Sequence, residues 1–315
     1  MQAILSEQFI PSRPLKTPVL FLVFNRLDTT KQVFEAIRRA KPPRLYVAAD
    51  GPRDSKPDED NKVKAVRDYV IGHIDWDCEV KTLFREKNLG CKYGVSGGID
   101  WFFENEEEGI ILEDDCLPSQ SFFWFCEELL ERYRGDMRIG MISGNNLFEQ
   151  KTVLKESYFF SYGNIWGWAS WRRCWTQYDV EMKLWENTRE QNHIKYFINN
   201  DHIFTNLERN FHHMVSADID TWDYQWLFAR LSNELLTINP SKNLVSNIGF
   251  GEDSTHTVGV SEFSNLKKHE LSFPLNHPKH VSINNEYVNS QYASIPIRKK
   301  IRSFILNKLK WKRFY

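Results

Sequence analysis

The first part of the chain alternates short apolar runs with helical patterns, and this alternation limits the possible folds more than any other feature. Residues 18–24 and 44–49 are apolar runs rich in strand formers, typical of strands covered on both faces. Between them, apolar residues recur at helical spacing until Pro42-Pro43 ends the pattern. We therefore expect a strand–helix–strand unit, with Asp28 as the helix cap.

The alternation continues to about residue 145 and predicts a mostly parallel sheet with helices on both faces, an α/β fold. Acidic, basic and amide residues should then gather where the strands end. The further expected elements are a helix within 57–72, a strand at 78–84, a helix from near Tyr93 to about Phe103, a strand over the apolar run 109–112, a helix from Phe122 to Tyr133 and a strand at 138–143.

Three consecutive acids, Glu113, Asp114 and Asp115, follow the apolar run 109–112. Ligands bind at the carboxyl ends of parallel strands, so we expect chemistry here. Crowded carboxylates repel one another, and a cation or a ring of hydrogen-bond donors must offset that repulsion. Mg²⁺ or Mn²⁺ suits one or two carboxylates, with phosphates and waters completing its shell. The alternative is a solvated acidic turn before a helix.

Composition is that of an ordinary soluble globular protein, with 41% hydrophobic residues and a net charge of -1. Because the chain has no overall positive charge, nucleic acid is not an expected partner. The five cysteines show neither CxxC spacing nor paired histidines, which argues against a disulfide framework and a zinc site and favours a reducing cytoplasm. We expect no secretion signal or membrane span.

Several short segments follow one another in a characteristic order: Val23-Phe24-Asn25-Arg26, Ala49-Asp50-Gly51, Ile111-Leu112-Glu113-Asp114-Asp115, Ile142-Ser143-Gly144-Asn145-Asn146, Gly167-Trp168-Ala169, Trp222-Asp223-Tyr224-Gln225-Trp226 and Asn247-Ile248-Gly249-Phe250-Gly251. Their order resembles that of the nucleotide-sugar-dependent glycosyltransferases of the GT-A fold. The pattern is most similar to that of N-acetylglucosaminyltransferase I and of bacterial sugar transferases like it, over residues 18 to about 256.

The resemblance implies a role for each residue of the nucleotide-binding part. Asp115 would be the direct ligand of Mn²⁺ or Mg²⁺, and Arg26 would neutralise the donor diphosphate. Asp50 would accept a hydrogen bond from the nucleotide base, unless it is only a turn aspartate before Gly-Pro. The other expected donor-binding residues are Asn25, Arg85, Glu113 and Asp114.

Asp223 is the candidate general base, which would take the proton of the acceptor hydroxyl as that oxygen attacks the anomeric carbon. The alternative is a helix N-cap without a catalytic role. His256 lies in a Gly-, Ser- and Thr-rich segment, 249–265, that is either a mobile loop closing over a ligand or a plain surface connector. His256 is accordingly either a second metal ligand or a solvated side chain.

The C-terminal residues 296–315 combine an apolar helical face with many Lys and Arg side chains. Such a helix can lie in the surface of an anionic membrane, although a solvated helix and a partner-binding helix have the same pattern. The expected parts of the chain are an irregular lead-in at 1–16, a GT-A domain at 17–292 with a nucleotide-binding half of about 17–146 and an acceptor half of about 147–292, and a basic amphipathic tail at 293–315.

The aromatic acceptor half contains Trp166 and Trp168, which either stack on an acceptor sugar or belong to the core. The leading hypothesis is a metal-dependent, inverting glycosyltransferase that moves a sugar from a nucleotide-diphosphate donor, UDP-linked by expectation, to a glycan or lipid-linked glycan. It would work on the inner face of the cytoplasmic membrane. The alternatives are a sugar-phosphate nucleotidyltransferase and a non-catalytic, carbohydrate-binding or membrane-associated scaffold on the same fold.

Overall fold

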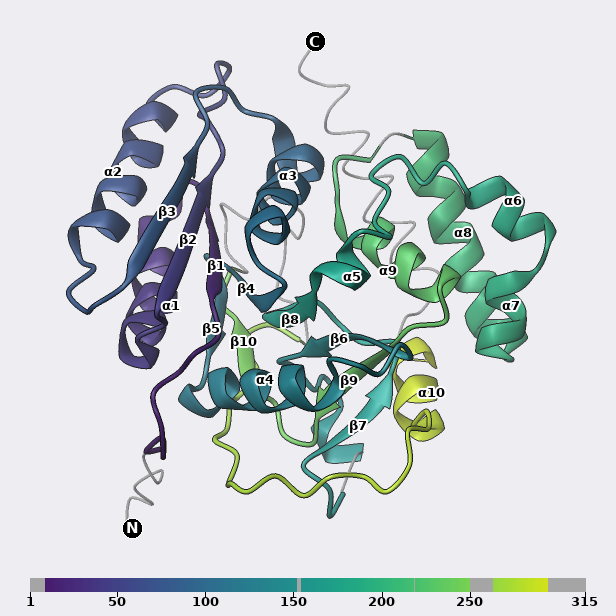
Figure 1. Ribbon diagram of the computed structural model, residues 1–315. Coiled ribbons are helices and arrows are strands. Elements are labelled where there is room, and N and C mark those ends of the chain that lie inside the picture. The colour runs from purple at the N-terminus through teal and green to yellow at the C-terminus, as the bar shows by residue number, and fades with distance from the viewer. Residues whose placement is uncertain (1–8, 152–153, 218, 250–262, 294–315) are drawn as a thin grey trace.

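The computed structural model describes residues 9–151, 154–217, 219–249 and 263–293 (Figure 1). Its first half is a run of parallel strands with connecting helices. The strands are β1 (Val19–Val23), β2 (Arg44–Ala49), β3 (Glu79–Phe84) and β4 (Glu108–Glu113). The helices are α1 (Leu27–Ala40), α2 (Glu59–Gly72) and α3 (Gly90–Asn105). Every residue of β1 is buried, as its continuous apolar sequence predicts.

The chain changes direction across the sheet between β1 and β4, which are parallel neighbours. From β1 the connections run outward to β2 and β3, and α3 then leads back past β1 to β4. Right-handed crossovers therefore place α1 and α2 on one face and α3 on the other. The carboxyl ends of β1 and β4 border the switch point, where open α/β sheets bind ligands.

The second half extends the same sheet and adds strands that run the opposite way. The added strands are β6 (Ile139–Ser143), β7 (Tyr158–Ser161), β8 (Trp168–Trp171) and β9 (Leu236–Pro240). The eight strands follow the order β3-β2-β1-β4-β8-β6-β9-β7, in which β8 and β7 are antiparallel to their neighbours. A separate pair joins β5 (Cys116–Pro118) to β10 (Val245–Asn247). The sheet is thus mostly parallel.

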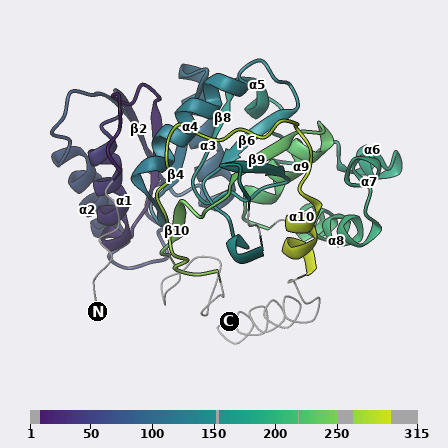
Figure 2. The ribbon, with the colours of Figure 1, turned by 90° about the horizontal axis from the view of Figure 1, so that it is seen from below.

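Helices of the second half gather at the end of the sheet away from α1 and α2 (Figures 1 and 2). An exception is α4 (Gln120–Tyr133), which packs against α1, β4, β6 and β8. The remaining helices are η1 (Glu149–Lys151), α5 (Arg172–Trp175), α6 (Trp185–Glu190), α7 (His193–Ile198), α8 (Asp201–Ala217), α9 (Asp223–Ser232) and α10 (Asn285–Ala293). No helix among the described residues is long and apolar enough to cross a bilayer.

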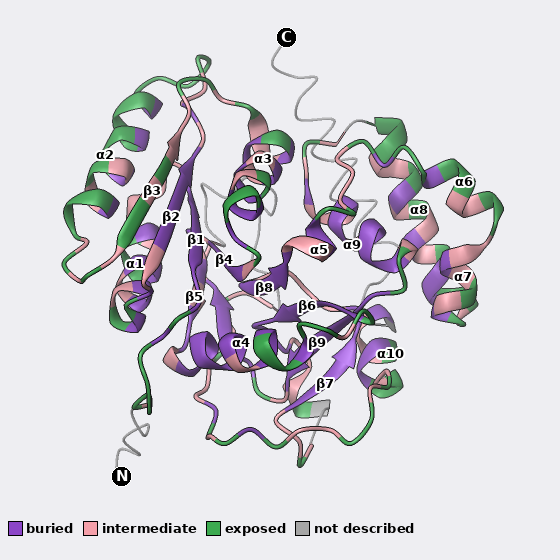
Figure 3. Cartoon of the chain, in the orientation of Figure 1, coloured by how far each residue is buried: buried purple, intermediate pink, exposed green. Residues whose placement is uncertain are grey.

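A cluster of tryptophans joins the sheet to this helical end. The Trp168 ring of β8 lies 5.9 Å from that of Trp222 and 5.7 Å from that of Trp226, and Trp226 lies 5.1 Å from Trp175. Burying several large rings together supplies much of the apolar contact in this half. Trp168 therefore belongs to the core, where burial is nearly complete along the central strands (Figure 3).

The predicted fold class, a mostly parallel α/β sheet with helices on both faces consistent with a GT-A fold, is confirmed, with corrections in detail. Residue Asp28 does not cap α1, because the helix begins at Leu27 and its cap position is Arg26. Helix α3 begins at Gly90, three residues before the expected start. All five cysteines are free. The amphipathic tail at 296–315 lies outside the described residues, as do residues 250–262 of the predicted loop.

Candidate functional site

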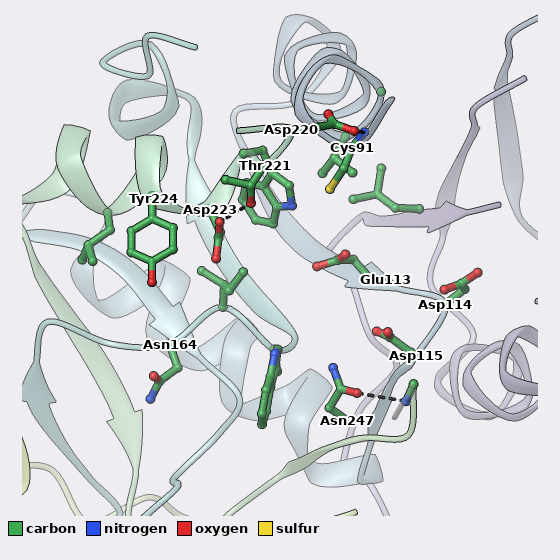
Figure 4. A pocket seen from close by; sticks show the side chains of 18 of the residues that line it. Cys91, Glu113, Asp114, Asp115, Asn164, Asp220, Thr221, Asp223, Tyr224 and Asn247 are labelled. Carbon is green, nitrogen blue, oxygen red and sulfur yellow. Dashed lines mark hydrogen bonds between the residues drawn. The ribbon is translucent and has the colours of Figure 1, made fainter. Parts of the chain in front are cut away.

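A cavity of about 660 Å³ opens at the carboxyl ends of β1 and β4, where the switch point predicts a ligand site. Its walls come from both halves of the chain: strand ends and the start of α3 on one side, and α9 with the segment before it on the other. Figure 4 shows the carboxylates of Glu113 and Asp115 on one wall and that of Asp223 across the open space. Distant segments therefore meet in one site.

The acid triplet is held beside β1 by an arginine and a backbone amide. Asp114 is only 3% exposed and accepts a hydrogen bond from the amide of Phe24 at 3.3 Å. The guanidinium of Arg26 forms ion pairs with Asp114 and with Asp115, the latter at 3.0 Å. Arg26, which was expected to meet a diphosphate, thus partly neutralises the acids in this structure. Burial opposes the charge, but the two acids raise the pKa of Arg26 above its ordinary value.

One arginine does not balance the negative charge that the fold collects here. Burial, followed by the charges of Asp115 and Asp114, raises the pKa of Glu113 to about 8. Burial also raises the pKa of Asp114 to about 6, although Arg26 acts in the opposite direction. Neighbouring carboxylates repel one another when all of them are ionised, and a bound cation stabilises this ionised form.

The donor atoms of this wall fit a hard divalent cation held in part by a substrate. Carboxylate oxygens are the ligands that Mg²⁺ and Mn²⁺ prefer, and one or two of them are enough when phosphate oxygens complete the shell. The described residues contain no group of three or more His, Cys, Asp or Glu that would hold an ion without such help. His256, the other expected ligand, lies outside the described residues.

Asp50 lines the cavity but is already engaged by the backbone at the start of α3. Its carboxylate accepts hydrogen bonds from the amides of Leu89 at 2.9 Å and Gly90 at 3.1 Å. Burial raises the pKa of Asp50 above its ordinary value, and these amide bonds counteract the rise. A structural role at this turn is therefore established by contacts, whereas the nucleotide-base contact stays a prediction.

Two of the expected donor-binding residues do not line the cavity. The Asn25 side chain donates to Glu59 at 2.9 Å, and Arg85 donates to the carbonyl oxygen of Gly94 at 3.0 Å. Both residues follow strand ends, as predicted, but neither lines the cavity, and their side chains contact other protein groups. The strand-end rule places a residue at the correct edge of the sheet without fixing the direction of its side chain.

The start of α9 carries the candidate base, and the segment before it carries an acid that sequence reasoning missed. Asp223 is the first residue of α9, Trp222 occupies the cap position, and no side chain caps this helix, so the N-cap interpretation of Asp223 is wrong. The hydroxyl of Thr221 donates to Oδ1 of Asp223. The missed acid, Asp220, accepts from the amides of Cys91 at 3.1 Å and Lys92 at 2.7 Å in the first turn of α3.

The wall opposite the triplet combines aromatic, amide and basic side chains. Trp166 lines the cavity, whereas Trp168 is buried in the core, so the two tryptophans have different roles. Asn164 and Tyr224 lie on the same side as Asp223 (Figure 4). The periodic patterns that identified strands gave no signal for Asn164 or Tyr224, because both acquire a cavity position only when the two halves pack.

Known proteins resemble this chain only distantly. No protein-family profile matches this sequence, and no curated protein matches it. A mannosyltransferase from Pyrobaculum calidifontis, solved with GDP-Man and Mn²⁺, is 11% identical with a TM-score of 0.36; the match covers 56% of this chain and 51% of that chain. The present chain thus matches about half the length of that protein.

Other similar solved structures include an enzyme of a different class. TarS residues 1–349 from S. aureus are 8% identical with a TM-score of 0.41, covering 73% of this chain and 59% of that chain. UDP-glucose pyrophosphorylase with UDP-glucose is 12% identical with a TM-score of 0.31, covering 52% of this chain and 79% of that chain. At such identities and TM-scores the likenesses do not bear on activity, which has to be argued from the cavity.

Proposed function

We propose that this protein is a metal-dependent glycosyltransferase that moves a sugar from a nucleotide-diphosphate donor, UDP-linked by preference, to a glycan or lipid-linked glycan with inversion. The observation that carries the proposal is the cavity itself. It brings the acid triplet and Arg26 on one wall together with Asp223 on the other. A sugar transferase needs these two chemistries, one for the diphosphate and one for the acceptor hydroxyl, on opposite sides of the reacting carbon.

On the donor wall, Asp115 would hold Mn²⁺ or Mg²⁺. When bound, the metal would stabilise the negative charge that develops on the departing nucleoside diphosphate. Arg26 lies beside Asp115 and carries a planar set of donors suited to phosphate oxygens. Glu113 points into the same space and is available to the donor sugar or to metal-bound water (Figure 4).

On the acceptor wall, Asp223 would take the proton of the attacking hydroxyl. Thr221 donates to Oδ1, and among the described residues Oδ2 accepts no hydrogen bond. One carboxylate oxygen is therefore held in place while the other keeps its lone pairs for the proton. Direct attack by the acceptor oxygen on the anomeric carbon, with the nucleoside diphosphate leaving from the opposite face, gives the inverted product. Inversion and the specific likeness to N-acetylglucosaminyltransferase I rest on the sequence resemblance.

The test measures thermal stability with UDP-, GDP-, CMP- and dTDP-sugars, each with and without Mn²⁺. A ligand at about 100 times its dissociation constant adds about 2.7 kcal/mol to the free energy of unfolding. We expect one nucleotide to stabilise the protein only with the metal, and Asp115→Ala to lose that response. Asp75→Ala is the matched control, because it removes an exposed acid outside the cavity and should keep the metal-dependent stabilisation. No response to any donor would favour the scaffold alternative.

A sugar-phosphate nucleotidyltransferase remains the enzymatic alternative. That class needs a glycine-rich loop after the first strand to cradle a triphosphate, whereas β1 leads through Phe24, Asn25 and Arg26 directly into α1. Incubation with sugar 1-phosphates and nucleoside triphosphates should release no pyrophosphate. Release of pyrophosphate at a rate that matches sugar transfer would contradict the proposal.

A further inference from the structure

The part of the cavity that α9 lines contains a buried arginine without an acidic partner among the described residues. Arg230 lines the cavity, yet it is only 1% exposed. Its Nη1 donates to the carbonyl oxygen of Tyr162 at 2.6 Å and to the Thr237 hydroxyl at 2.5 Å. Within the described part of the chain, no carboxylate forms an ion pair with it. A buried charge without a counter-ion is costly, so such a group invites a role in binding an anion.

Most of the donors on this guanidinium are unused. Nε is buried and has no hydrogen-bond partner. The hydrogen bonds of the guanidinium to described residues both come from Nη1, which leaves Nη2 without one among them. Nε and Nη2 form one edge of the planar guanidinium, the edge that matches two oxygens of a carboxylate or phosphate. Burial lowers the pKa of Arg230 to about 10, so the side chain still carries its charge at neutral pH.

The cavity lining contains a second unpartnered donor, the side-chain amide of Asn145. Asn145 is fully buried and lines the cavity, and its Nδ2 has no hydrogen-bond partner. Its backbone carbonyl oxygen accepts from the side chain of Asn239, while Arg230 donates to Thr237, two residues earlier on the same strand. Residues two apart on a strand share a face and are roughly 7 Å apart. The guanidinium of Arg230 and the backbone of Asn145 are therefore held at neighbouring positions on one face of β9.

The position of Arg230 relative to the candidate base follows from helix geometry. Asp223 and Arg230 are seven residues apart on α9, and Leu227 between them also lines the cavity. Seven residues are two turns, so the two side chains share a face and are about 10 Å apart along the axis. Arg230 therefore lies about 10 Å from the candidate base along α9.

We propose that the acceptor carries an anionic group, a carboxylate or a phosphate, which Arg230 and Asn145 bind while the acceptor hydroxyl lies at Asp223. That the anion belongs to an acceptor rests on the proposed function. The anion site itself does not depend on it. Acidic sugars and sugar phosphates both offer the required oxygens. A neutral glycan would leave the buried cation unpaired, and it should bind more weakly.

The test compares three small probes by calorimetry: methyl β-glucuronide, glucose 6-phosphate and the neutral methyl β-glucoside. Excess UDP and Mn²⁺ are present so that phosphate groups do not fill the donor wall. We expect at least one acidic probe to bind tenfold or more tightly than the glucoside, and the tighter of the two identifies the natural anion. Equal affinity for all three probes overturns the proposal.

Variants assign the binding to Arg230. Arg230→Met should lower the affinity for the acidic probe tenfold or more. Arg230→Lys keeps the positive charge but loses the planar set of donors, so its affinity should lie between those of the wild type and Arg230→Met. Arg173→Met is the control, because that arginine binds backbone carbonyls outside the cavity. If Arg230→Met fails to fold, Asn145→Leu is tested in its place and should lower the affinity for the acidic probe severalfold. Undiminished binding in the folded variant refutes the assignment.

The same experiment separates this inference from the proposed function. The anion site is independent of the donor wall, so acidic probes should bind even in the absence of UDP and Mn²⁺. If the sugar nucleotides fail to bind but the acidic probes still depend on Arg230, only the glycosyltransferase proposal fails. If UDP displaces the acidic probe, the probe occupies the donor wall, and the anion site is refuted while the donor site is supported.

Discussion

At the scale of single residues, the chemistry depends on carboxylates whose surroundings differ sharply. Glu113 and Asp114 are crowded by like charges, and Asp114 is also buried, whereas Asp223 lies across the cavity with a hydroxyl donor on one oxygen. Different surroundings give similar side chains different tasks, because an acid that must accept a proton needs a free oxygen and access to substrate. Asp223 meets both requirements.

Asp223→Asn should lower turnover about 10²-fold or more while donor affinity stays unchanged. The amide keeps the size of the side chain but cannot accept the acceptor's proton. Sugar transfer to an acceptor and donor binding by calorimetry measure the two effects separately. Turnover equal to that of the wild type would exclude Asp223 as the base, and a parallel loss of donor binding would indicate a folding defect instead.

At the scale of elements, the start of α3 connects the two walls of the cavity. Its first amides are satisfied by Asp50, which follows β2, and by Asp220, which precedes α9. Gly90 permits this arrangement with a φ of 79°, where a Cβ would approach the Asp220 carboxylate to 2.9 Å. Two carboxylates from distant segments thereby replace the local cap that the sequence of α3 lacks.

Asp220→Ala should therefore lower the free energy of unfolding by about 1 kcal/mol, the usual cost of losing a cap. Urea denaturation measures this change. Asp68→Ala is the control, because it removes an exposed acid in the middle of a helix and should lower the free energy of unfolding by less. Asp179→Ala would not serve, since it removes a hydrogen bond within a local turn. A stability equal to that of the wild type would show that these amides find other partners.

The start of α2 gives a pH-dependent contribution to stability. Hydrogen bonds from Arg53 are the largest cause that lowers the pKa of Glu59, whose side chain is only 4% exposed. A carboxyl with a lowered folded-state pKa stabilises the protein above its unfolded pKa of about 4.3. That contribution disappears as the pH falls through the folded-state value.

Glu59→Gln should accordingly flatten the pH dependence of stability between about pH 5 and pH 3. Urea unfolding of both proteins across this range gives the comparison, with the wild type losing more stability on acidification than the variant. Glu79→Gln, at an exposed acid of the edge strand, serves as the control and should follow the wild type. Identical slopes for Glu59→Gln and the wild type would contradict the assignment.

At the scale of the whole molecule, the basic tail 296–315 is proposed to hold the protein on an anionic membrane, where lipid-linked acceptors are found. Each basic side chain near such a surface contributes about 1 kcal/mol of attraction. Removing the tail should abolish sedimentation with vesicles that contain phosphatidylserine. Neutral vesicles and high salt are the controls, since salt screens this attraction. Undiminished binding by the truncated protein would refute the membrane role.

Sequence by itself determined the parallel sheet and the strand edge at which chemistry is proposed. Apolar runs such as 18–24 and helical periodicity are local patterns: a continuous run indicates burial on both faces of a strand, and a helical period indicates one buried face of a helix. The antiparallel strands β7 and β8 escaped prediction, because they are short and lie in an aromatic region without clear alternation. Such strands are specified mainly by their neighbours in the sheet.

Tertiary structure alone decided which of the polar residues share a cavity. It turned Asn25 and Arg85 toward protein groups, paired Arg26 with the acids, and brought Asp220 and Arg230 to positions that no local pattern marks. The physical reason is that a side chain's partner is set by packing between segments far apart in the chain. Local sequence determines the elements, and only their packing determines which charges meet.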